Sequence, residues 1–359
     1  MRLPVLGARA AETTLCTYCP KLCRPACPVS TVEARETVTP WGKMRAMGEL
    51  VRDVAPVDAS HTAPAYACTG CMACFELCEL DNPVAETLRD GRVEAFTHGV
   101  APASVHAFVG TFAAREEAVK RNAATLGPTS ATARTALFPG CSALTFERSA
   151  IDPLRRAVGV LTGSSVAVVA DACCGLPLLE AGDREGFAVR ARALATRLER
   201  FDRVVTGDAG CAHALRVMYP KFGVRVPTVQ HIAETAAASL GRVERLADPP
   251  NRVVYHDSCR LGRGLGVFDE PRAVLTRLLG RAPGELPVKR EHGVCSGGGG
   301  LLPITRPETS SAIANELAEL VRESGGETVV TACATSRQML RRAGVDAVDL
   351  GELLARALA

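Results

Sequence analysis

The feature that most constrains this chain is an adjacent pair of cysteines, Cys173-Cys174-Gly175, which closes an apolar run. Thirty-one residues lie between Cys141 and this pair, and 36 residues lie between the pair and Cys211. A degraded copy of the layout follows about 120 residues later, around Cys295-Ser296-Gly297. A repeat of this length that retains its chemistry indicates a duplicated domain rather than a solenoid of short units.

The composition is ordinary for a globular protein, except for its cysteines. A chain of 359 residues has room for two or three domains, and its net charge of +3 is too small to indicate binding to nucleic acid or a membrane surface. No apolar run is long enough for a transmembrane helix, so we expect no membrane insertion. The first residues lack the hydrophobic core of a signal peptide, so we expect a cytoplasmic, reducing compartment. Fifteen cysteines in that compartment indicate metal or iron–sulfur ligation rather than disulfides.

Eight of the fifteen cysteines fall in two tight runs near the N-terminus, at residues 16–27 and 68–78. Three closely spaced thiolates can reach different irons of one cubane cluster, and the fourth cysteine of each run then reaches the other cluster. On this logic one 4Fe–4S cluster is held by Cys16, Cys19, Cys23 and Cys78. The other is held by Cys68, Cys71, Cys74 and Cys27. A pair of tetrahedral zinc sites is the structural alternative, since zinc also binds Cys-x-x-Cys.

Forty residues separate the two runs, from Cys27 to Cys68, more than a compact bacterial ferredoxin would place there. Apolar residues recur at helical spacing within residues 41–53, so we expect a helix in this insert. The first domain therefore resembles the α-helical ferredoxins of succinate dehydrogenase iron–sulfur subunits. Residues 84–121 look mostly helical, most clearly from Val105 to Lys120, and a polar connector at residues 122–131 marks a boundary. We interpret His61, His98 and His106 as surface or core residues without a ligand role.

From Arg134 onward, short apolar runs alternate with amphipathic segments, as in α/β units. Strands are expected at residues 136–138, 166–170, 204–206, 252–255, 291–294 and 328–331. Helices are expected near residues 145–160, 187–200, 271–280, 308–323 and 334–343. By spacing, Cys141, Cys173 and Cys211 correspond to Cys259, Cys295 and Cys333. Each of these cysteines follows an expected strand, so all should gather at one edge of a parallel sheet, where such domains bind ligands.

The layout Cys-x31-Cys-Cys-Gly-x35-Cys, followed by its copy from His256, resembles the cysteine-rich "CCG" domain. That domain occurs in a subunit of heterodisulfide reductase and in the iron–sulfur subunits of glycolate oxidase, anaerobic glycerol-3-phosphate dehydrogenase and the lactate-utilisation system. In the heterodisulfide reductase relative each repeat binds a noncubane 4Fe–4S cluster that cleaves a disulfide. In the dehydrogenase relatives the subunit is taken to pass electrons from a flavoprotein towards quinone.

The chain departs from the family pattern in both repeats. The family often ends each repeat with Cys-x-x-Cys, and by spacing the last positions are Ala214 and Ser336 here. The first repeat keeps four thiols, Cys141, Cys173, Cys174 and Cys211. The second repeat keeps three, Cys259, Cys295 and Cys333, with Ser296 in the place of the second adjacent cysteine. Three interpretations stay open for the second repeat. Ser296 could ligate iron through its oxygen, an iron with an open coordination site could bind substrate, or the repeat could be a structural relic.

Other motifs refine the candidate site. His213 and His256 lie near ligand cysteines, so with Cys173 and Cys174 they are candidates for a catalytic role, although each histidine can equally satisfy a local backbone group. The run Gly297–Gly300 lacks the residues that complete a phosphate-binding loop, so it favours close backbone approach to a metal site or partner loop. No dinucleotide fingerprint is present, so we expect no flavin or NAD bound by this chain.

These observations predict a multidomain protein: an α-helical ferredoxin domain (residues 1–100), a helical connector (101–133) and two tandem α/β cysteine-rich repeats (134–248 and 249–359). The expected function is an iron–sulfur electron-transfer subunit, rather than a stand-alone enzyme, linking a flavoprotein to a quinone, carrier or disulfide acceptor. The expected partner is a flavin-binding dehydrogenase subunit or an electron-transfer flavoprotein, through which the chain could reach a membrane. The expected cofactors are two 4Fe–4S clusters and a third cluster in the first repeat. A thiol–disulfide reductase and a zinc-bound scaffold are the alternatives.

Overall fold

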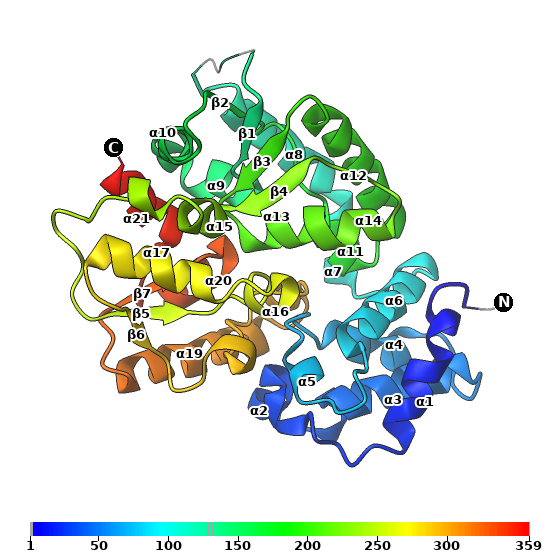
Figure 1. Cartoon of the computed structure of the whole chain (residues 1–359). Helices are drawn as coiled ribbons and strands as arrows, with labels where there is room; N and C mark the ends of the chain where they lie inside the picture. Colours follow the sequence, from blue (N-terminus) through cyan, green and yellow to red (C-terminus); the bar gives the residue numbers. More distant parts are fainter. Residues whose placement is uncertain (1–2, 128–129, 131, 359) are drawn as a thin grey trace. The chain divides into compact units, whose positions relative to one another are not determined.

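The computed structural model describes residues 3–127, 130 and 132–358 (Figure 1). These residues form two compact units that each draw on separate stretches of the chain. Unit 1 comprises residues 1–111, 177–187 and 291–317, and unit 2 comprises residues 112–176, 188–290 and 318–359. The segments that follow the central Cys-Cys and Cys-Ser motifs of the two repeats therefore belong to the same unit as the N-terminal helices.

The regular secondary structure in the described residues of unit 1 is all helical, with no β-strand. Its main helices are α1 (Ala10–Thr17), α2 (Pro28–Glu33), α3 (Pro40–Val51), α4 (Ala59–Tyr66), α5 (Ala73–Glu76), α6 (Val84–Thr97), α7 (Ala103–Gly110), α11 (Leu176–Ala181), α18 (Leu302–Thr305) and the first part of α19 (Pro307–Glu323). The helix expected at residues 41–53 is α3, and Thr39 caps it by accepting a hydrogen bond from the backbone N–H of Gly42. The apolar face of α3 is buried in the core that α1 and α6 complete.

Unit 2 contains two four-stranded sheets in which every pairing is parallel. The first sheet has the order β2-β1-β3-β4 and the second has the order β6-β5-β7-β8. The strands are β1 (Thr135–Phe138), β2 (Val166–Val168), β3 (Arg203–Thr206), β4 (Thr228–His231), β5 (Val253–His256), β6 (Gly284–Glu285), β7 (Thr328–Thr331) and β8 (Asp346–Asp349). The matching orders place β1 to β4 in correspondence with β5 to β8, so the sheets have the same topology.

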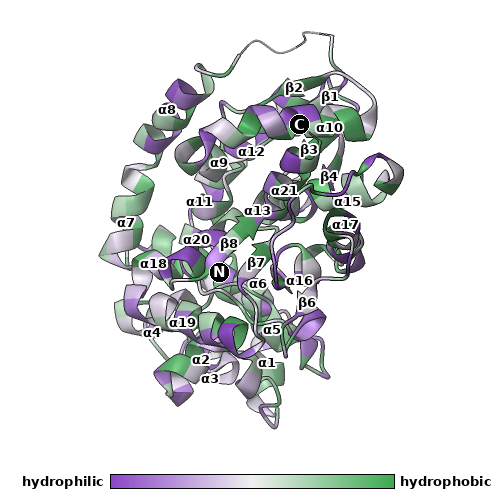
Figure 2. Ribbon diagram, turned by 90° about the vertical axis from the view of Figure 1, so that its left-hand side faces the viewer, coloured by the Kyte–Doolittle hydropathy of each residue, from purple (hydrophilic) through white to green (hydrophobic). Residues whose placement is uncertain are grey.

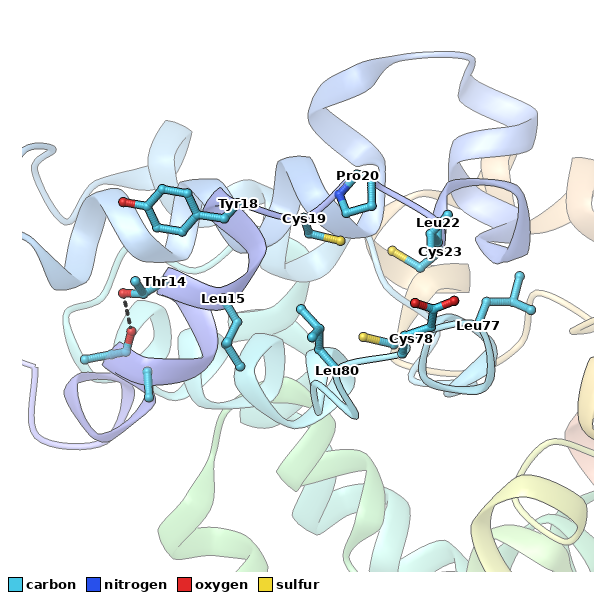
Figure 3. Close-up of a pocket in the computed structure, with 13 residues that line it drawn as sticks. Thr14, Leu15, Tyr18, Cys19, Pro20, Leu22, Cys23, Leu77, Cys78 and Leu80 are labelled. Carbon is cyan, nitrogen blue, oxygen red and sulfur yellow. Dashed lines mark hydrogen bonds between the residues drawn. The ribbon is translucent and has the colours of Figure 1, made fainter.

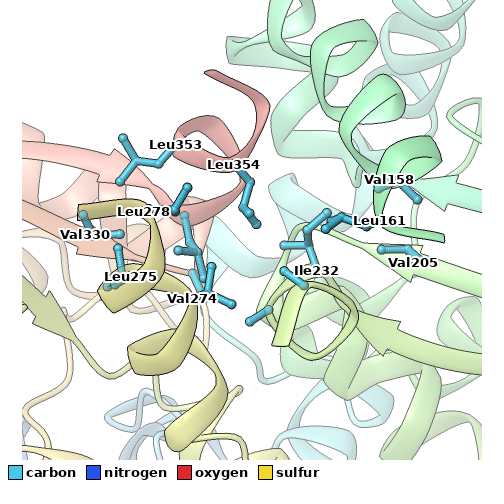
Figure 4. Close-up of a cluster of buried hydrophobic side chains, with 14 of the residues drawn as sticks. Val158, Leu161, Val205, Ile232, Val274, Leu275, Leu278, Val330, Leu353 and Leu354 are labelled. Atoms are coloured by element: carbon cyan, nitrogen blue, oxygen red, sulfur yellow. The ribbon is translucent and has the colours of Figure 1, made fainter. Parts of the chain in front are cut away.

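Helices that link the strands also join the two sheets into one core. The helices of unit 2 are α8 (Phe112–Ala123), α9 (Cys141–Phe146), α10 (Ile151–Thr162), most of α12 (Arg184–Leu198), α13 (Ala209–His213), α14 (Tyr219–Lys221), α15 (Ile232–Ala237), α16 (Gly262–Leu265), α17 (Asp269–Leu279), α20 (Ala334–Arg342) and α21 (Leu350–Ala357). Helix α10 packs against α21 and α15 packs against α17, so each contact pairs one helix from each repeat. Figure 4 shows the buried side chains where these helices meet, among them Leu161, Ile232, Val274 and Leu354. Because one apolar cluster serves both repeats, we infer that neither repeat is a separate folding unit.

The sequence-based elements agree with most of the structure. Five of the six expected strands correspond to β1, β2, β3, β5 and β7, and the five expected helices correspond to α10, α12, α17, α19 and α20. The strand expected at residues 291–294 is wrong, because this stretch holds a short 3-10 turn (Arg290–His292) and irregular backbone. The strand that pairs with β5 at this edge of the second sheet is instead β6. The sequence-based assignment also missed β4 and β8.

The region expected to be helical at residues 84–121 is three helices, α6, α7 and α8. Its clearest stretch, Val105–Lys120, is interrupted at Thr111, where unit 1 ends. In Figure 2 α8 alternates between purple and green, since its charged residues share the helix with Phe112 and Val119, which are buried. Residues 128, 129 and 131 of the expected connector lie outside the described residues. Among the described helices none is both long and apolar enough to cross a membrane.

Candidate metal centres

The structure brings together the four N-terminal thiols that spacing assigns to the first cluster. This set, called centre 1, is Cys16, Cys19, Cys23 and Cys78. Figure 3 shows the sulfur atoms of Cys19, Cys23 and Cys78 around a common space. Backbone N–H groups of Lys21 and Asn82 donate to the sulfurs of Cys19 and Cys78 at 3.3 and 3.5 Å, and the Asn82 side-chain amide donates to Cys16 at 3.2 Å. Such donors suit thiolates that carry negative charge.

The other four thiols form a second set, called centre 2: Cys27, Cys68, Cys71 and Cys74. The loop between α4 and α5 turns through two left-handed residues, Gly70 at φ +65° and Met72 at φ +64°. This curvature aims the Gly70 N–H at the Cys68 sulfur, 3.3 Å away. The ammonium of Lys43, on α3, lies 3.3 Å from the Cys27 sulfur. The fourth cysteine of each run therefore lies with the first three of the other run, while ligation itself stays a prediction.

Burial and crowding oppose ionisation of these thiols when they stand alone. Burial, followed by the charges of the neighbouring cysteines, raises the pKa of Cys16 to about 12. The same two causes raise the pKa of Cys23 to about 11 and that of Cys74 well above its usual range. A set of four buried thiolates would repel one another unless cations lay between them. The donor set therefore fits a cationic iron–sulfur group, whose binding would release the thiol protons.

A buried arginine holds the polypeptide around centre 2. Arg92 of α6 donates to the backbone carbonyls of Ala65 at 2.9 Å, Cys68 at 2.6 Å and Gly300 at 3.0 Å. Its guanidinium also pairs with the carboxylate of Glu180 at 3.1 Å, and Arg89 contacts the same carboxylate at 3.2 Å. One side chain thus joins the cysteine loop to residues more than 200 positions further along the chain.

The glycine run expected to allow close backbone approach does so against the centre 2 loop. A Cβ atom at Gly299 would lie 2.3 Å from the carbonyl oxygen of Thr69, and one at Gly300 would lie 2.1 Å from that of Cys68. Because real Cβ atoms essentially never come this close, these positions exclude any side chain. The run therefore serves backbone packing beside a thiol set, and not a phosphate.

The first repeat gathers its four thiols at the carboxyl edge of the first sheet. Within this set, called centre 3, the sulfurs of Cys141 and Cys173 are 3.7 Å apart, as are those of Cys174 and Cys211. Gly175, at φ +77°, turns its N–H back to the Cys173 sulfur at 3.5 Å. The hydrogen bond with Cys173, followed by burial, raises the pKa of Cys141 well above its usual range.

Two further residues complete the surroundings of centre 3. Gly140 lies so close that an added Cβ would be 3.1 Å from the Cys211 sulfur, and the Tyr219 hydroxyl donates to the carbonyl of Cys174 at 3.1 Å. Both contacts fix the backbone that carries the thiols, which indicates a pre-formed site.

The strand register corrects the correspondence that spacing gave between Cys211 and Cys333. In the first sheet Phe138 pairs with Thr206, and in the second sheet His256 pairs with Thr331, so Thr206 and Thr331 are equivalent. Counting from these residues, Cys333 corresponds to Asp208, and Ser336 corresponds to Cys211. Equal spacing in the sequence is misleading because the two copies differ in the length of the segment before β3 and β7. The first copy therefore ends in Asp-x-x-Cys and the second in Cys-x-x-Ser. Ala214, which spacing paired with Ser336, does not correspond to it.

Asp208 is the residue that sequence reasoning missed. One of its carboxylate oxygens accepts from the N–H of Cys211 at 3.0 Å, and the other accepts from the N–H of Ala334 at 3.2 Å. It therefore caps α13 of the first repeat and also holds the start of α20 in the second. An aspartate two residues past a buried strand, before Ala-Gly-Cys, is the sequence signal that could have identified it.

In the second repeat the described thiols do not form a comparable set within one unit. Cys259 and Cys333 belong to unit 2, whereas Cys295 and Ser296 belong to unit 1. Burial raises the pKa of Cys333 to about 12, although hydrogen bonding from Ser336 acts in the opposite direction. The Gly297 N–H donates to the Cys295 sulfur at 3.4 Å, which repeats the turn seen at Gly175. The three alternatives for this repeat stay open.

The two candidate histidines have local partners. His256 lies in β5, where its Nδ1 is 3.1 Å from the Thr331 hydroxyl. His213 lies in α13 with its Nδ1 3.4 Å from the guanidinium of Arg260, which can only donate, so this nitrogen accepts. A catalytic role for either histidine, or for Cys173 and Cys174, stays a prediction. Within the described residues no three Cys, His, Asp or Glu side chains have the arrangement of ligands to a single metal ion.

Comparison with known protein families agrees with this arrangement. A 4Fe-4S dicluster domain matches residues 12–82, which contain all eight cysteines of centres 1 and 2. A cysteine-rich domain matches twice, at residues 135–216 and 253–341. The chain is an iron–sulfur protein that contains cysteine-rich domains. This cysteine-rich domain protein thus combines a dicluster domain with two copies of the domain that carries centre 3.

The similar curated proteins include subunits of two reductases. The chain is 28% identical over 340 residues to one subunit of the CoM/CoB fumarate reductase of Methanothermobacter marburgensis, covering 87% of this chain and 64% of the relative. It is 29% identical over 203 residues to one subunit of the dihydromethanophenazine:CoB–CoM heterodisulfide reductase of Methanosarcina barkeri, covering 52% of this chain and 49% of the relative. The cysteine-rich domain protein thus spans about half to two thirds of the length of these relatives.

Proposed function

We propose that the protein is the iron–sulfur subunit of a multi-subunit oxidoreductase, in which it carries electrons between a flavoprotein and a quinone, carrier or disulfide acceptor. The proposal includes two 4Fe–4S clusters in an α-helical ferredoxin domain, at centres 1 and 2, and a third iron–sulfur group at centre 3. Bound clusters would supply one-electron redox chemistry, with potentials that depend on hydrogen bonds to sulfur, charge and solvent exposure. The chain's own residues would supply the thiolate ligands, the N–H donors and the exclusion of water.

The observation that carries this proposal is the sharing of cysteines between the two N-terminal runs. Cys78 lies with the first run and Cys27 lies with the second, so the two thiol sets are linked by short stretches of polypeptide. Two zinc knuckles would have no need for this exchange, since each run already has four thiols. The exchange keeps two clusters adjacent, which suits electron transfer between them. The names of the similar proteins, which are subunits of reductases, also favour an electron-transfer role.

A partner would meet the chain at centre 1. The side chains of Leu15, Tyr18 and Leu80 are 42%, 86% and 49% exposed, and all three line a pocket of about 750 Å³. The same pocket is lined by Cys19 and Cys78 (Figure 3). An apolar rim around ligand thiols suits transient docking of a redox protein, because the contact excludes water where the electron passes. The flavoprotein partner is the proposed occupant of this surface.

A thiol–disulfide reductase is the second candidate, and centre 3 is the observation that favours it. Asp208 takes the place of a thiol there, so the set of four sulfurs is bordered by a carboxylate instead of a fifth sulfur. Bond cleavage at a disulfide needs two electrons and two protons, and the two N-terminal clusters would supply the electrons one at a time.

Acceptor specificity separates these two functions. Protein purified anaerobically and reduced with dithionite is freed of excess reductant and mixed with either a water-soluble quinone or a small-molecule disulfide. The electron-transfer proposal predicts that quinone reoxidises the clusters and that the isolated protein releases no thiol from the disulfide, because a disulfide acceptor would be cleaved at a partner subunit. Thiol release from the disulfide, lost in Cys174→Ala, would favour the reductase and contradict the proposal.

A further inference from the structure

Lys43 is a buried cation whose contact is a cysteine sulfur. The residue is 1% exposed, on the first turns of α3, and its ammonium lies 3.3 Å from the sulfur of Cys27. Among the described residues this ammonium contacts no carboxylate. The neighbouring positions Met44 and Met47 are fully buried, so the lysine lies where the sequence pattern of the helix would place an apolar side chain.

A buried ammonium without an anion is strongly unfavourable, because it loses its hydration and gains little in return. A neutral thiol is too weak an acceptor to compensate for that loss. A thiolate that ligates a cluster is a much better partner, since the thiolates and sulfides together carry net negative charge. The burial of Lys43 beside the Cys27 sulfur therefore fits a cluster ligand at that position.

Centre 1 has no equivalent cation among its described donors. Its contacts come from the backbone N–H groups of Lys21 and Asn82 and from the amide of Asn82, all of which are neutral dipoles. The other cation near centre 2, Arg92, shares the carboxylate of Glu180 with Arg89 and donates to the backbone carbonyl of Cys68, not to a ligand sulfur. A full charge at 3.3 Å in a buried site acts more strongly than one such dipole. Centre 2 therefore has a cation in contact with a cysteine sulfur, and centre 1 has none among its described donors.

We propose that Lys43 sets the reduction potential of centre 2, by stabilising the extra negative charge that the cluster there gains when it accepts an electron. Burial alone would disfavour that charge and keep such a cluster oxidised. The ammonium offsets this effect, so electrons can pass through centre 2 instead of stopping at centre 1. Lys43 acts through Cys27 and the cluster field, and it is a positioning and electrostatic residue rather than a ligand. The inference rests on the proposed function, since it requires clusters at both centres.

Potentiometric titration of the purified protein, followed by electron paramagnetic resonance, measures the midpoints of the clusters. Lys43→Met removes the charge and keeps an unbranched side chain. It should lower one midpoint until the ratio of reduced to oxidised cluster at the wild-type midpoint potential falls about tenfold or more, which for one electron is about 59 mV. Lys43→Arg keeps the charge and should restore most of the shift. Arg45→Gln removes an exposed cation from the same helix and should move neither midpoint.

Asn82→Leu identifies the other centre, because it removes the amide donor to Cys16. It should lower a different midpoint from the one that Lys43→Met lowers. The inference is overturned if Lys43→Met retains both clusters with unchanged midpoints, or if both variants move the same midpoint. If Lys43→Met loses four irons, the midpoints of Lys43→Gln are measured instead. If Lys43→Arg loses the same irons although it keeps the charge, the role of Lys43 is in packing, and the inference is overturned. Wild-type protein without iron would contradict the proposed function itself, which is a separate result.

Discussion

Asp208 and Cys333 occupy the same position in the two repeats, each two residues beyond the third strand of its sheet and at the start of a helix. The carboxylate of Asp208 also reaches across to the helix that Cys333 begins, where it accepts from the N–H of Ala334 at 3.2 Å. Asp208 of the first repeat thus caps one helix in each repeat. The residue that stands opposite Cys333 in the first repeat therefore forms a structural link between the two copies.

Substitutions of Asp208 should destabilise the protein in graded fashion. Asp208→Ala removes the acceptors of two helix N-termini, and each lost cap costs about 0.5–2 kcal/mol. Asp208→Asn keeps one acceptor oxygen and should cost roughly half as much. Urea unfolding under reducing conditions measures both variants. Equal stability of the alanine variant and wild type would show that the two caps contribute nothing.

Asp349 should make stability depend on pH. Burial raises the pKa of this carboxyl to about 7, against the opposing charge of Arg337 and the N–H of Gly351. The folded state therefore binds more protons than the unfolded state between about pH 4 and 7, and stability falls as pH rises through that window. Asp349→Asn keeps an acceptor for the N–H of Gly351 but does not titrate. Its free energy of unfolding relative to wild type should therefore be more favourable at pH 8 than at pH 5. Unfolding curves of both proteins at the two pH values measure this difference in free energy. A difference that does not change with pH would contradict the raised pKa of Asp349.

Arg92→Met should be among the most destabilising substitutions in unit 1. It leaves the buried Glu180 with one fewer cation and removes the donor to four backbone carbonyls. Breaking a buried pair in this way costs about 3–5 kcal/mol. Arg45→Met removes an exposed partner of Glu49 on α3 and should cost less than about 1 kcal/mol. Thermal unfolding of the two variants compares them directly. Similar losses for both would mean that the network of Arg92 does not hold unit 1 together.

Cys174→Ala should remove the group at centre 3 alone. The sulfur of Cys174 lies 3.7 Å from that of Cys211, whereas the thiols of centres 1 and 2 belong to the other unit. Iron content should fall by about four per chain, with the two cubane signals retained. Cys295→Ala is the matched variant in the second repeat and should lower iron content less. Equal losses would show that the second repeat holds a group of its own.

Much of the fold follows from local patterns in the sequence. The apolar runs that end at Phe138 and Thr331 predict buried parallel strands, and the helical spacing of Met44 and Met47 predicts α3. The missed strands β4 and β8 are edge strands with polar residues, Thr228–His231 and Asp346–Asp349. Edge strands need less apolar surface, so periodicity gives little signal there.

The thiol sets were largely predictable, but their surroundings were not. Cysteine spacing is a chemical pattern that survives without knowledge of the fold, so the partners of Cys27 and Cys78 could be assigned. Asp208 was missed because its importance depends on strand register, and linear spacing paired Cys211 with the wrong residue. Lys43 was missed because a lysine in a helix usually indicates a solvated face, and only tertiary packing reveals its burial.

Metal and sulfide analysis of anaerobically purified protein is the most direct test of an iron–sulfur electron-transfer subunit. The expected result is about eight irons or more per chain, with acid-labile sulfide in a similar amount, as two four-iron clusters require. Stoichiometric zinc without sulfide would contradict it and would make the cysteine sets structural.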